Sequence, residues 1–437
     1  MKIEGLPGIP RVWLDFLESK LPALPLPSSI EAMAANSGEI RTRAAVNEEL
    51  IRYLSAQGKT PRLVENIQRL KQPDSVLVVA AVTAALFGGP AAQILKCLTA
   101  IRACEELTKV SVNAVPVCWI GTVSPGFDQW SATLIDAESE LHLLNVSPGE
   151  LVPGSIANVI SRVSDFGRGS FDPETLQSLG AAFIPGNSFS SATARLFSSL
   201  MKDLGIIALD ADAPEVRRVV SGMIPPAKIV GPSPHLLISS VLPVLAFVVD
   251  PLEVQSLAQA LTAFDEAGLP RPSAWPRASA TLGDVKSRRA LGRYRLDLTQ
   301  LFPGEEEVVR GIRDALPRSG LAKLDGIKPD VEKRVAELKS FWGGERRSSG
   351  RADSCKGKIL YQLDKLRNHF EAALEVKEQT AGRRIHRLCN LLAPNGRLQE
   401  WELAGIQVPL SYSRTGLRSL YDKLDIRAFE HQLIWMD

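Results

Sequence analysis

The polar side chains that could carry out chemistry follow a set of apolar segments in the middle of the chain. They are Thr83, Lys96, Thr122, Ser124, Asp128, Asp210, Asp212, Asp250 and Glu253. A ligase or a nucleotide-using enzyme needs cations or amide donors to hold an anion, and an acid to hold a metal ion or a substrate amine. Each residue alone also has a structural explanation, because a lysine can lie along a protein surface and an acid can cap a helix. Their grouping favours a common site.

One stretch, Ser75–Arg102, predicts a buried strand, a turn at Gly88-Gly89-Pro90 and an amphipathic helix. In many α/β proteins the free backbone N–H groups at the start of such a helix bind a phosphate or a carboxylate. This turn has the glycines and the proline of an anion site, but almost no polar side chains. The stretch therefore looks like a binding site from which the reactive side chains have been removed.

Serine–histidine–acid catalysis and metal catalysis are poorly supported by the sequence. It contains no G-x-S-x-G, H-E-x-x-H or Walker motif, and its five histidines are widely spaced. Its five cysteines form no C-x-x-C pair and no zinc-ligand spacing, so we expect no metal site and a reduced, cytoplasmic protein. Arg346, Arg347 and Arg351 are expected on a solvated loop tip rather than in an anion site.

The elements that must position these residues alternate between strand and helix. The predicted strands are Val76–Ala80, Val115–Ile120, Ile206–Leu209 and Leu245–Val249, and the predicted helices are Ala91–Leu107, Ser191–Leu204, Ala213–Met223 and Pro251–Ala267. This alternation predicts an α/β fold with an open parallel sheet and helices on both faces. Ligands bind beyond the carboxyl ends of the strands in such sheets. We expect Asn145–Asn187, which is rich in Gly, Pro and Ser, to form an irregular excursion.

A different pattern begins after Phe302. Apolar residues recur at helical, heptad-like spacing in two runs, which are Val331, Val335, Leu338 and Trp342, then Ile359, Leu363, Leu366, Phe370 and Ala373. A polar turn, Gly343–Ser354, joins the runs, and the second helix is expected to continue to Leu392. We therefore predict an antiparallel helical hairpin, or a coiled coil that pairs two copies into a homodimer. The predicted domains are a core at 1–301, with its main sheet at 75–284, a helical region at 302–392, and a segment at 393–437 that packs back on the body.

The bulk composition is that of an ordinary water-soluble protein. The chain has 437 residues, a formal net charge of +2 and 45% hydrophobic residues, which allows a large core and more than one domain. A charge balance so close to neutral argues against nucleic-acid or membrane partners. The longest apolar runs are shorter than the ~20 residues that a membrane helix needs, so we expect no span.

Several segments, in their order along the chain, resemble the bacillithiol biosynthesis cysteine-adding enzyme family (BshC). These segments are VLVVAAVTAALFGGPAAQILK, VPVCWIGTVSPGFDQW, LPVLAFVVDPLEVQSLAQ, PSAWPRASATL and RRIHRLCNLLAPNGRLQEWEL. The resemblance implies a Rossmann-like core, a C-terminal coiled coil that forms dimers, and addition of cysteine to the amine of glucosaminyl-malate. By position it implies Lys96, Asp128, Glu253 and Arg277 as candidate catalytic residues, and Gly89, Pro90 and Trp119 as candidate substrate-binding residues.

The chain also departs from the family pattern. Residues Ala80 to Thr83 stand where the family has two glycines and two glutamines, and Leu95 replaces a histidine. Two hypotheses follow: a working cysteine ligase with a rebuilt site, or a catalytically inactive homologue that acts as a dimeric binding or regulatory partner. A nucleotide-binding α/β enzyme of another specificity is a third. The cofactor stays open, since the fold class accommodates a nucleotide.

Overall fold

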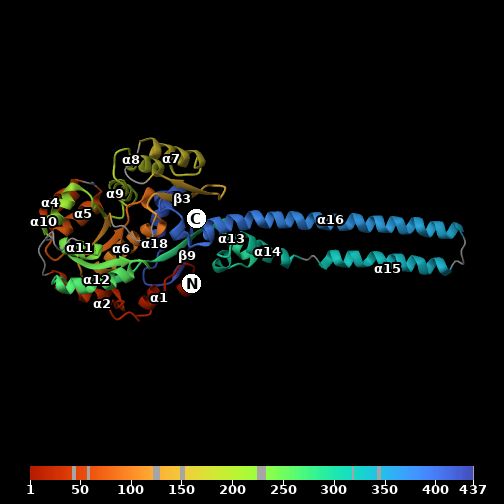
Figure 1. Ribbon diagram of the computed structural model, residues 1–437, viewed down its shortest axis with the longest axis horizontal. Coiled ribbons are helices and arrows are strands. Elements are labelled where there is room, and N and C mark those ends of the chain that lie inside the picture. Colours follow the sequence, from red (N-terminus) through yellow and green to blue (C-terminus); the bar gives the residue numbers. More distant parts are fainter. Residues whose placement is uncertain are drawn as a thin grey trace. The chain divides into compact units, whose positions relative to one another are not determined.

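The computed structural model describes residues 1–41, 46–56, 60–121, 128–147, 153–223, 233–316, 319–341 and 346–436 (Figure 1). Two compact units divide the chain, and each is described by itself. The first unit comprises Met1–Arg289 together with Asn390–Asp437, and the second comprises Ala290–Cys389. Thr122, Ser124 and Trp342, which the sequence analysis singled out, lie outside the described residues.

A five-stranded parallel sheet is the centre of the first unit, with the strand order β5-β2-β1-β6-β7. The strands are β1 (Val76–Val82), β2 (Ala114–Ile120), β5 (Ile207–Asp210), β6 (Val244–Val249) and β7 (Ser273–Pro276). Every residue of β1 and β2 is buried, as expected for parallel strands covered on both faces. The α/β parallel-sheet prediction is confirmed, and β7 is an additional strand that was not predicted.

The strand order sets the position of the ligand-binding edge. From β1 the chain proceeds outward through β2 to β5, and β6 then returns to the opposite side of β1. The strand order therefore reverses between β1 and β6. In open α/β sheets this switch point, at the carboxyl ends of the strands, is where ligands bind.

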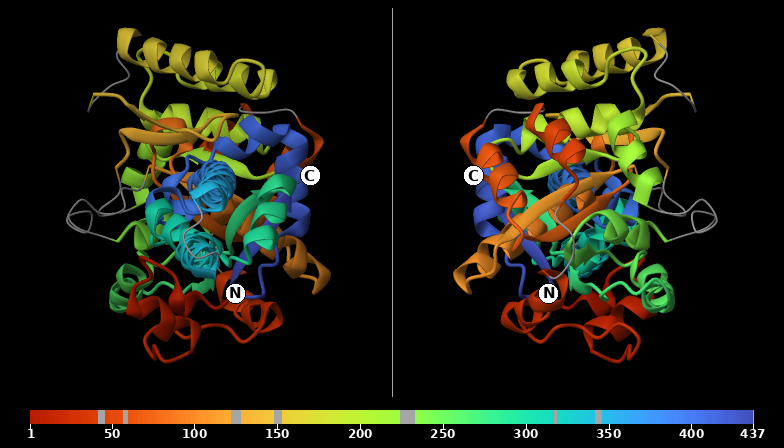
Figure 2. Two further views of the ribbon diagram at one scale, coloured as in Figure 1. Left: turned by 90° about the vertical axis from the view of Figure 1, so that its right-hand side faces the viewer. Right: turned by 90° about the vertical axis from the view of Figure 1, so that its left-hand side faces the viewer.

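Helices lie on both sides of this sheet (Figure 2). Those that follow its strands are α6 (Ala91–Lys109), α10 (Pro214–Met223) and α12 (Val254–Glu266), while α9 (Phe189–Leu200) precedes β5 and α11 (Pro234–Val241) precedes β6. The amino-terminal helices are η1 (Ile3–Gly5), α1 (Arg11–Leu17), α2 (Ile30–Ala35), α3 (Ser37–Arg41), α4 (Glu48–Ala56) and α5 (Pro61–Leu70). The predicted helices are thus found, although α12 begins at Val254 and not at Pro251.

The segment expected to be an irregular excursion is largely regular, so that prediction is wrong. It follows a hairpin of β3 (Ser131–Ile135) and β4 (Leu141–Asn145), and it contains α7 (Pro153–Phe166) and α8 (Pro173–Ala182). Asp172 caps α8 by accepting a hydrogen bond from the Thr175 backbone N–H at 2.8 Å. The prolines that suggested irregular structure instead mark helix starts, where their missing N–H costs nothing.

The carboxyl-terminal segment returns to the first unit. After η5 (Pro394–Gly396) come α17 (Gln399–Glu402), α18 (Gln407–Lys423) and β9 (His431–Met436). Strand β9 pairs in parallel with β8 (Ser279–Asp284), and residues 403–405 lie against the start of α6. Helices η2 (Leu86–Gly88), α13 (Val285–Tyr294) and η4 (Leu298–Leu301) complete the short elements.

The second unit contains α14 (Glu305–Ala315), α15 (Ser319–Phe341) and α16, which runs from Arg346 to Leu392. Ion pairs join α15 to α16 from Arg367 to Asp325 at 2.9 Å and from Lys339 to Asp353 at 2.7 Å. From the first pair to the second, the residue number rises from 325 to 339 along α15 and falls from 367 to 353 along α16. The two helices are therefore antiparallel. The predicted hairpin and its end at Leu392 are confirmed.

The arginines expected on a loop tip lie elsewhere. Arg346, Arg347 and Arg351 fall in the first turns of α16, because the helix already begins at Arg346. The glycines and serines of this segment suggested a longer loop, but the helix continues through Ser348 to Ser354. Among the described residues, no helix is long and apolar enough to cross a membrane.

Candidate functional site

A buried charged cluster lies at the switch point between β1 and β6. Lys96 on α6 has a side chain only 2% exposed, and its Nζ donates a 2.6 Å hydrogen bond to the carbonyl of Ala81 near the end of β1. The same ammonium group forms an ion pair with Glu253, the N-cap residue of α12, and lies 3.7 Å from Asp250 Oδ2. The structure thus brings together two of the four candidate catalytic residues, Lys96 and Glu253.

The turn after β6 holds the two acids in place. The backbone N–H of Asp250 donates to Glu253 Oε2 at 3.1 Å, and the backbone N–H of Glu253 donates to the Asp250 carbonyl at 3.0 Å. Burial, and next the charge of Asp250, raise the pKa of Glu253 to about 7 against the opposing effect of Lys96. A carboxyl group that titrates near neutral pH, held beside a cation, is suited to accepting and returning a proton.

Two polar side chains next to this cluster were not identified from the sequence. Gln93 lies one turn before Lys96 on the same face of α6, and its buried amide has no hydrogen-bond partner among the described residues. The buried His235 of α11 makes a 3.1 Å contact from Nδ1 to Ser233 Oγ, and no described residue bonds its Nε2. Burial, with a smaller effect of Lys96, lowers the pKa of His235 to about 3, so the ring is neutral.

The turn that begins α6 is occupied by the chain itself. The Ala91 backbone N–H donates to the Leu403 carbonyl at 2.8 Å, and the Gly405 N–H donates to the Gly89 carbonyl at 2.7 Å. Pro90 forms a β-bridge with Ala404. Gly89 and Pro90 are buried in these contacts, so residues 403–405 bond main-chain groups of the turn where the sequence suggested a phosphate or carboxylate site.

Asp128 and Trp119 form no hydrogen bond or ion pair with Lys96, Asp250 or Glu253 among the described residues. Asp128 is exposed, and its carboxylate accepts hydrogen bonds from the Trp130 backbone N–H at 2.9 Å and from Ser131 Oγ at 2.7 Å. These contacts explain Asp128 as the residue that shapes the turn into β3. Trp119 is 2% exposed within β2, paired in register with Ala81 and Leu209.

Arg277 belongs to a second buried network, just after β7. Its guanidinium donates to Glu400 Oε1 at 3.0 Å and to the Ala278 carbonyl at 3.0 Å, and it stacks over the Trp401 ring at 5.0 Å. Glu400 also accepts from Ser279 Oγ at 2.8 Å and from the Ala280 N–H at 2.7 Å. These partners hold α17 against β8. Nothing local in the sequence indicated Glu400, which is separated from Arg277 by 123 residues.

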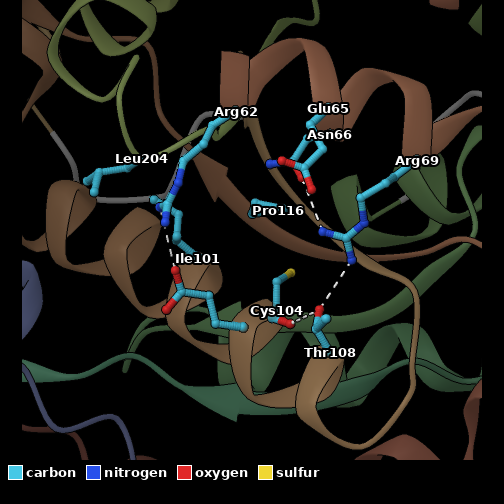
Figure 3. A pocket seen from close by; sticks show the side chains of 10 residues that line it. Arg62, Glu65, Asn66, Arg69, Ile101, Cys104, Thr108, Pro116 and Leu204 are labelled. Carbon is cyan, nitrogen blue, oxygen red and sulfur yellow. Dashed lines mark hydrogen bonds and ion pairs between the residues drawn. The ribbon is translucent and has the colours of Figure 1, made fainter. Parts of the chain in front are cut away.

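A cleft of about 230 Å³ lies at the opposite, amino-terminal end of the strands (Figure 3). Arg69 is its most connected cation, with hydrogen bonds to Asn113, Asn66, Thr108 and the Ala114 carbonyl at 2.9–3.3 Å. Arg62, on the same helix, lies 3.6 Å from Glu105. The guanidinium of Arg69 is therefore saturated by α5, α6 and the start of β2, and this cleft offers no comparable reactive group.

The described residues contain no cluster of three or more histidine, cysteine or acidic side chains arranged to hold a metal ion. The reactive groups of the switch point are thus a lysine and two carboxylates, with an amide and a neutral imidazole beside them. Such a set can bind a charged group and transfer a proton.

Comparison with known proteins identifies the family. Residues 27–227 match the bacillithiol biosynthesis BshC N-terminal Rossmann-like domain, and residues 280–436 match the BshC C-terminal coiled-coil domain. The chain belongs to the BshC family. The matched regions include Lys96 and Glu400, whereas Asp250, Glu253 and Arg277 lie between them.

Individual BshC relatives are distant in sequence, and two of three match more than two thirds of the chain. A candidate cysteine ligase BshC from Salinibacter ruber is 22% identical over 93% of this chain and 91% of its own length. The protein of the same name from Chlorobaculum tepidum is 23% identical over 68% of this chain and 71% of its own. That from Geobacillus kaustophilus is 29% identical over 38% of this chain and 31% of its own.

Proposed function

We propose that this BshC protein is a cysteine ligase of bacillithiol biosynthesis that forms an amide bond between the carboxyl group of cysteine and the amine of glucosaminyl-malate. The observation that supports the proposal is the buried Lys96–Glu253–Asp250 cluster at the switch point of the sheet. Amide formation needs a deprotonated amine and stabilisation of the negative charge that develops on the carboxyl oxygen.

Each member of the cluster has a role in this proposal. Glu253, whose pKa burial raises to about 7, accepts the proton that the attacking amine loses. Lys96 is held by Ala81 and Glu253 as a fixed positive charge that stabilises the oxyanion. Asp250 is the most exposed of the three, at 16% of its side chain, and is placed to orient the incoming ammonium group.

The overall condensation joins an amine to a carboxylate with loss of water, so the carboxylate must first be activated. A nucleotide, which the fold class accommodates, is the activating group in this proposal. The direct test gives the purified full-length protein cysteine, glucosaminyl-malate and a nucleoside triphosphate with magnesium, and follows the thiol product by mass spectrometry. Formation of the amide supports the proposal, and absence of product with every nucleotide contradicts it.

We further propose a cytoplasmic homodimer whose subunits meet through the helical hairpin. The hairpin exposes apolar side chains that a second copy could cover, among them Tyr361 at 64%, Leu366 at 54% and Val376 at 62%. All five cysteines are free thiols, which suits a reducing compartment. Leu366→Glu should convert a dimer to a monomer in light scattering coupled to size exclusion, whereas Lys365→Glu on the same helix should not. A wild-type monomer would contradict the dimer.

A further inference from the structure

A polar cavity of about 730 Å³ lies beyond the carboxyl end of β5, the edge strand of the sheet. Helices α4, α5, α9 and α10, which contribute to its walls, lie near one another in Figure 1. The cavity is within the size range of small-molecule sites. Two strand spacings of about 4.8 Å each separate β5 from β1, so the cavity is separate from the Lys96 cluster.

One wall of the cavity is a single face of α9 and the residues after it. Ser191, Arg195 and Ser198 follow one another at intervals of four and three residues, so they share one side of the helix, and Lys202 follows just after its end. Within the part of the chain that the structure describes, neither the Arg195 guanidinium nor the Lys202 ammonium group has an ion-pair or hydrogen-bond partner. The wall therefore presents an exposed arginine and a half-buried lysine among hydroxyl groups.

The facing wall is acidic. Asp210, at the end of β5, uses Oδ1 to accept hydrogen bonds from Ser190 and from the Asp212 N–H at 2.9 Å. Among the described residues, no group donates a hydrogen bond to the second oxygen of Asp210, Oδ2. The same is true of both carboxylate oxygens of Glu215. Arg217 pairs with Asp212 at 2.7 Å, which leaves Asp210 and Glu215 as the carboxylates of this wall without an ion pair among the described residues.

We propose that this cavity binds a free α-amino acid, with the carboxylate at Arg195 and the α-ammonium group at Asp210 and Glu215. A ligand with only a negative or only a positive charge would pair with one wall and leave the charges of the other wall without a partner. A zwitterion can pair with both walls. A planar guanidinium suits a carboxylate because it can donate two parallel hydrogen bonds. Burial raises the pKa of the Asp210 carboxyl, and a bound ammonium group would stabilise its ionised form.

The proposal goes beyond amide ligation, because a ligand here does not contact the Lys96 cluster. The probe is L-serine, compared with two analogues that each lack one charge: glycerate, which has no amine, and ethanolamine, which has no carboxylate. Calorimetric titration of the full-length protein should show L-serine binding at least tenfold more tightly than either analogue. Equal binding of glycerate or ethanolamine, or no binding of L-serine, would overturn the proposal.

Variants locate the binding. Arg195→Gln and Glu215→Gln should each weaken L-serine binding at least tenfold, whereas Arg168→Gln, an exposed arginine on the segment after α7, should leave it unchanged. Lys96→Met should also leave it unchanged. Binding that Lys96→Met abolishes and Arg195→Gln does not affect would place the ligand at the switch point and refute the cavity site. This experiment measures binding alone, so its outcome is independent of whether the protein makes an amide.

Discussion

The Arg277–Glu400 ion pair gives the most demanding stability prediction. The two side chains are 2% and 1% exposed, so neither charge is screened by water. Burial alone would raise the pKa of Glu400, but Arg277, His431 and the hydrogen bonds to Glu400 together lower it, so the carboxylate is ionised. Removing one partner of such a pair leaves the other charge buried and uncompensated, at a cost of about 3–5 kcal/mol.

Glu400→Gln is the perturbation of choice because it removes the negative charge with almost no change in side-chain volume. The amide oxygen can still accept the hydrogen bonds of Arg277 and Ser279, which share Oε1, whereas the Ala280 N–H, which bonds Oε2, loses its acceptor. We expect the free energy of unfolding to fall by about 3–5 kcal/mol, which lowers a urea midpoint by about 1 M or more at a slope of about 3 kcal/mol/M. Trp401, which lies under the Arg277 guanidinium, is a local fluorescence probe.

Two further variants test the reasoning behind that magnitude. Arg277→Met combined with Glu400→Gln removes both charges, so the double variant should be more stable than Glu400→Gln alone. Glu402→Gln, on the same short helix, breaks a contact with the 73% exposed Arg397 and should cost no more than about 1 kcal/mol. The reasoning is refuted if Glu400→Gln unfolds within about 1 kcal/mol of wild type, or if the double variant is the least stable.

Two other predictions concern pH and the turn before α6. Because the pKa of His235 is lowered in the folded protein, its neutral ring contributes stability that is fully present above pH 6.5 and is lost as pH falls toward 3. Between pH 7.5 and pH 4.5, the free energy of unfolding from urea titrations should therefore fall by about 2–3 kcal/mol more in wild type than in His235→Leu. Parallel loss in both proteins would contradict this. Gly88 has a φ of 81°, and a Cβ there would lie 2.5 Å from the Phe197 ring, so Gly88→Ala should cost about 2–4 kcal/mol by thermal or urea unfolding. Gly180, inside α8, is the control because a Cβ added there would meet no neighbouring side chain within 4 Å, and its replacement by alanine should stabilise by about 0.5–1 kcal/mol.

The fold was largely predictable from sequence because its strands are continuous apolar runs. Strands β1, β2, β5 and β6 are buried on both faces, so their composition alone marks them. Strand β7 is also buried, but it begins with a serine and ends with a proline, so it is not a continuous apolar run. The end of α16 was predictable because a proline and a glycine follow it closely, whereas its start lies among residues that favour turns.

The candidate site was predictable only in part. Lys96 and Glu253 could be placed near the carboxyl ends of strands, but their pairing depends on how β1 and β6 lie side by side, which sequence order does not reveal. A lysine in mid-helix is more often a surface residue, so its burial could not be inferred. Likewise, the segment that covers Gly89 and Pro90 comes from residues 403–405, more than 300 positions away.

The central claim is that the Lys96–Glu253–Asp250 cluster at the switch point carries out amide formation. The rate of amide formation by Glu253→Gln tests this claim most directly. With cysteine, glucosaminyl-malate and nucleotide, we expect kcat/KM of wild type to rise through pH 7 as Glu253 loses its proton, and Glu253→Gln to be at least about 100-fold slower with no such rise. Glu266→Gln, at the other end of α12, should match wild type. A Glu253→Gln enzyme with the rate and pH profile of wild type would contradict the claim.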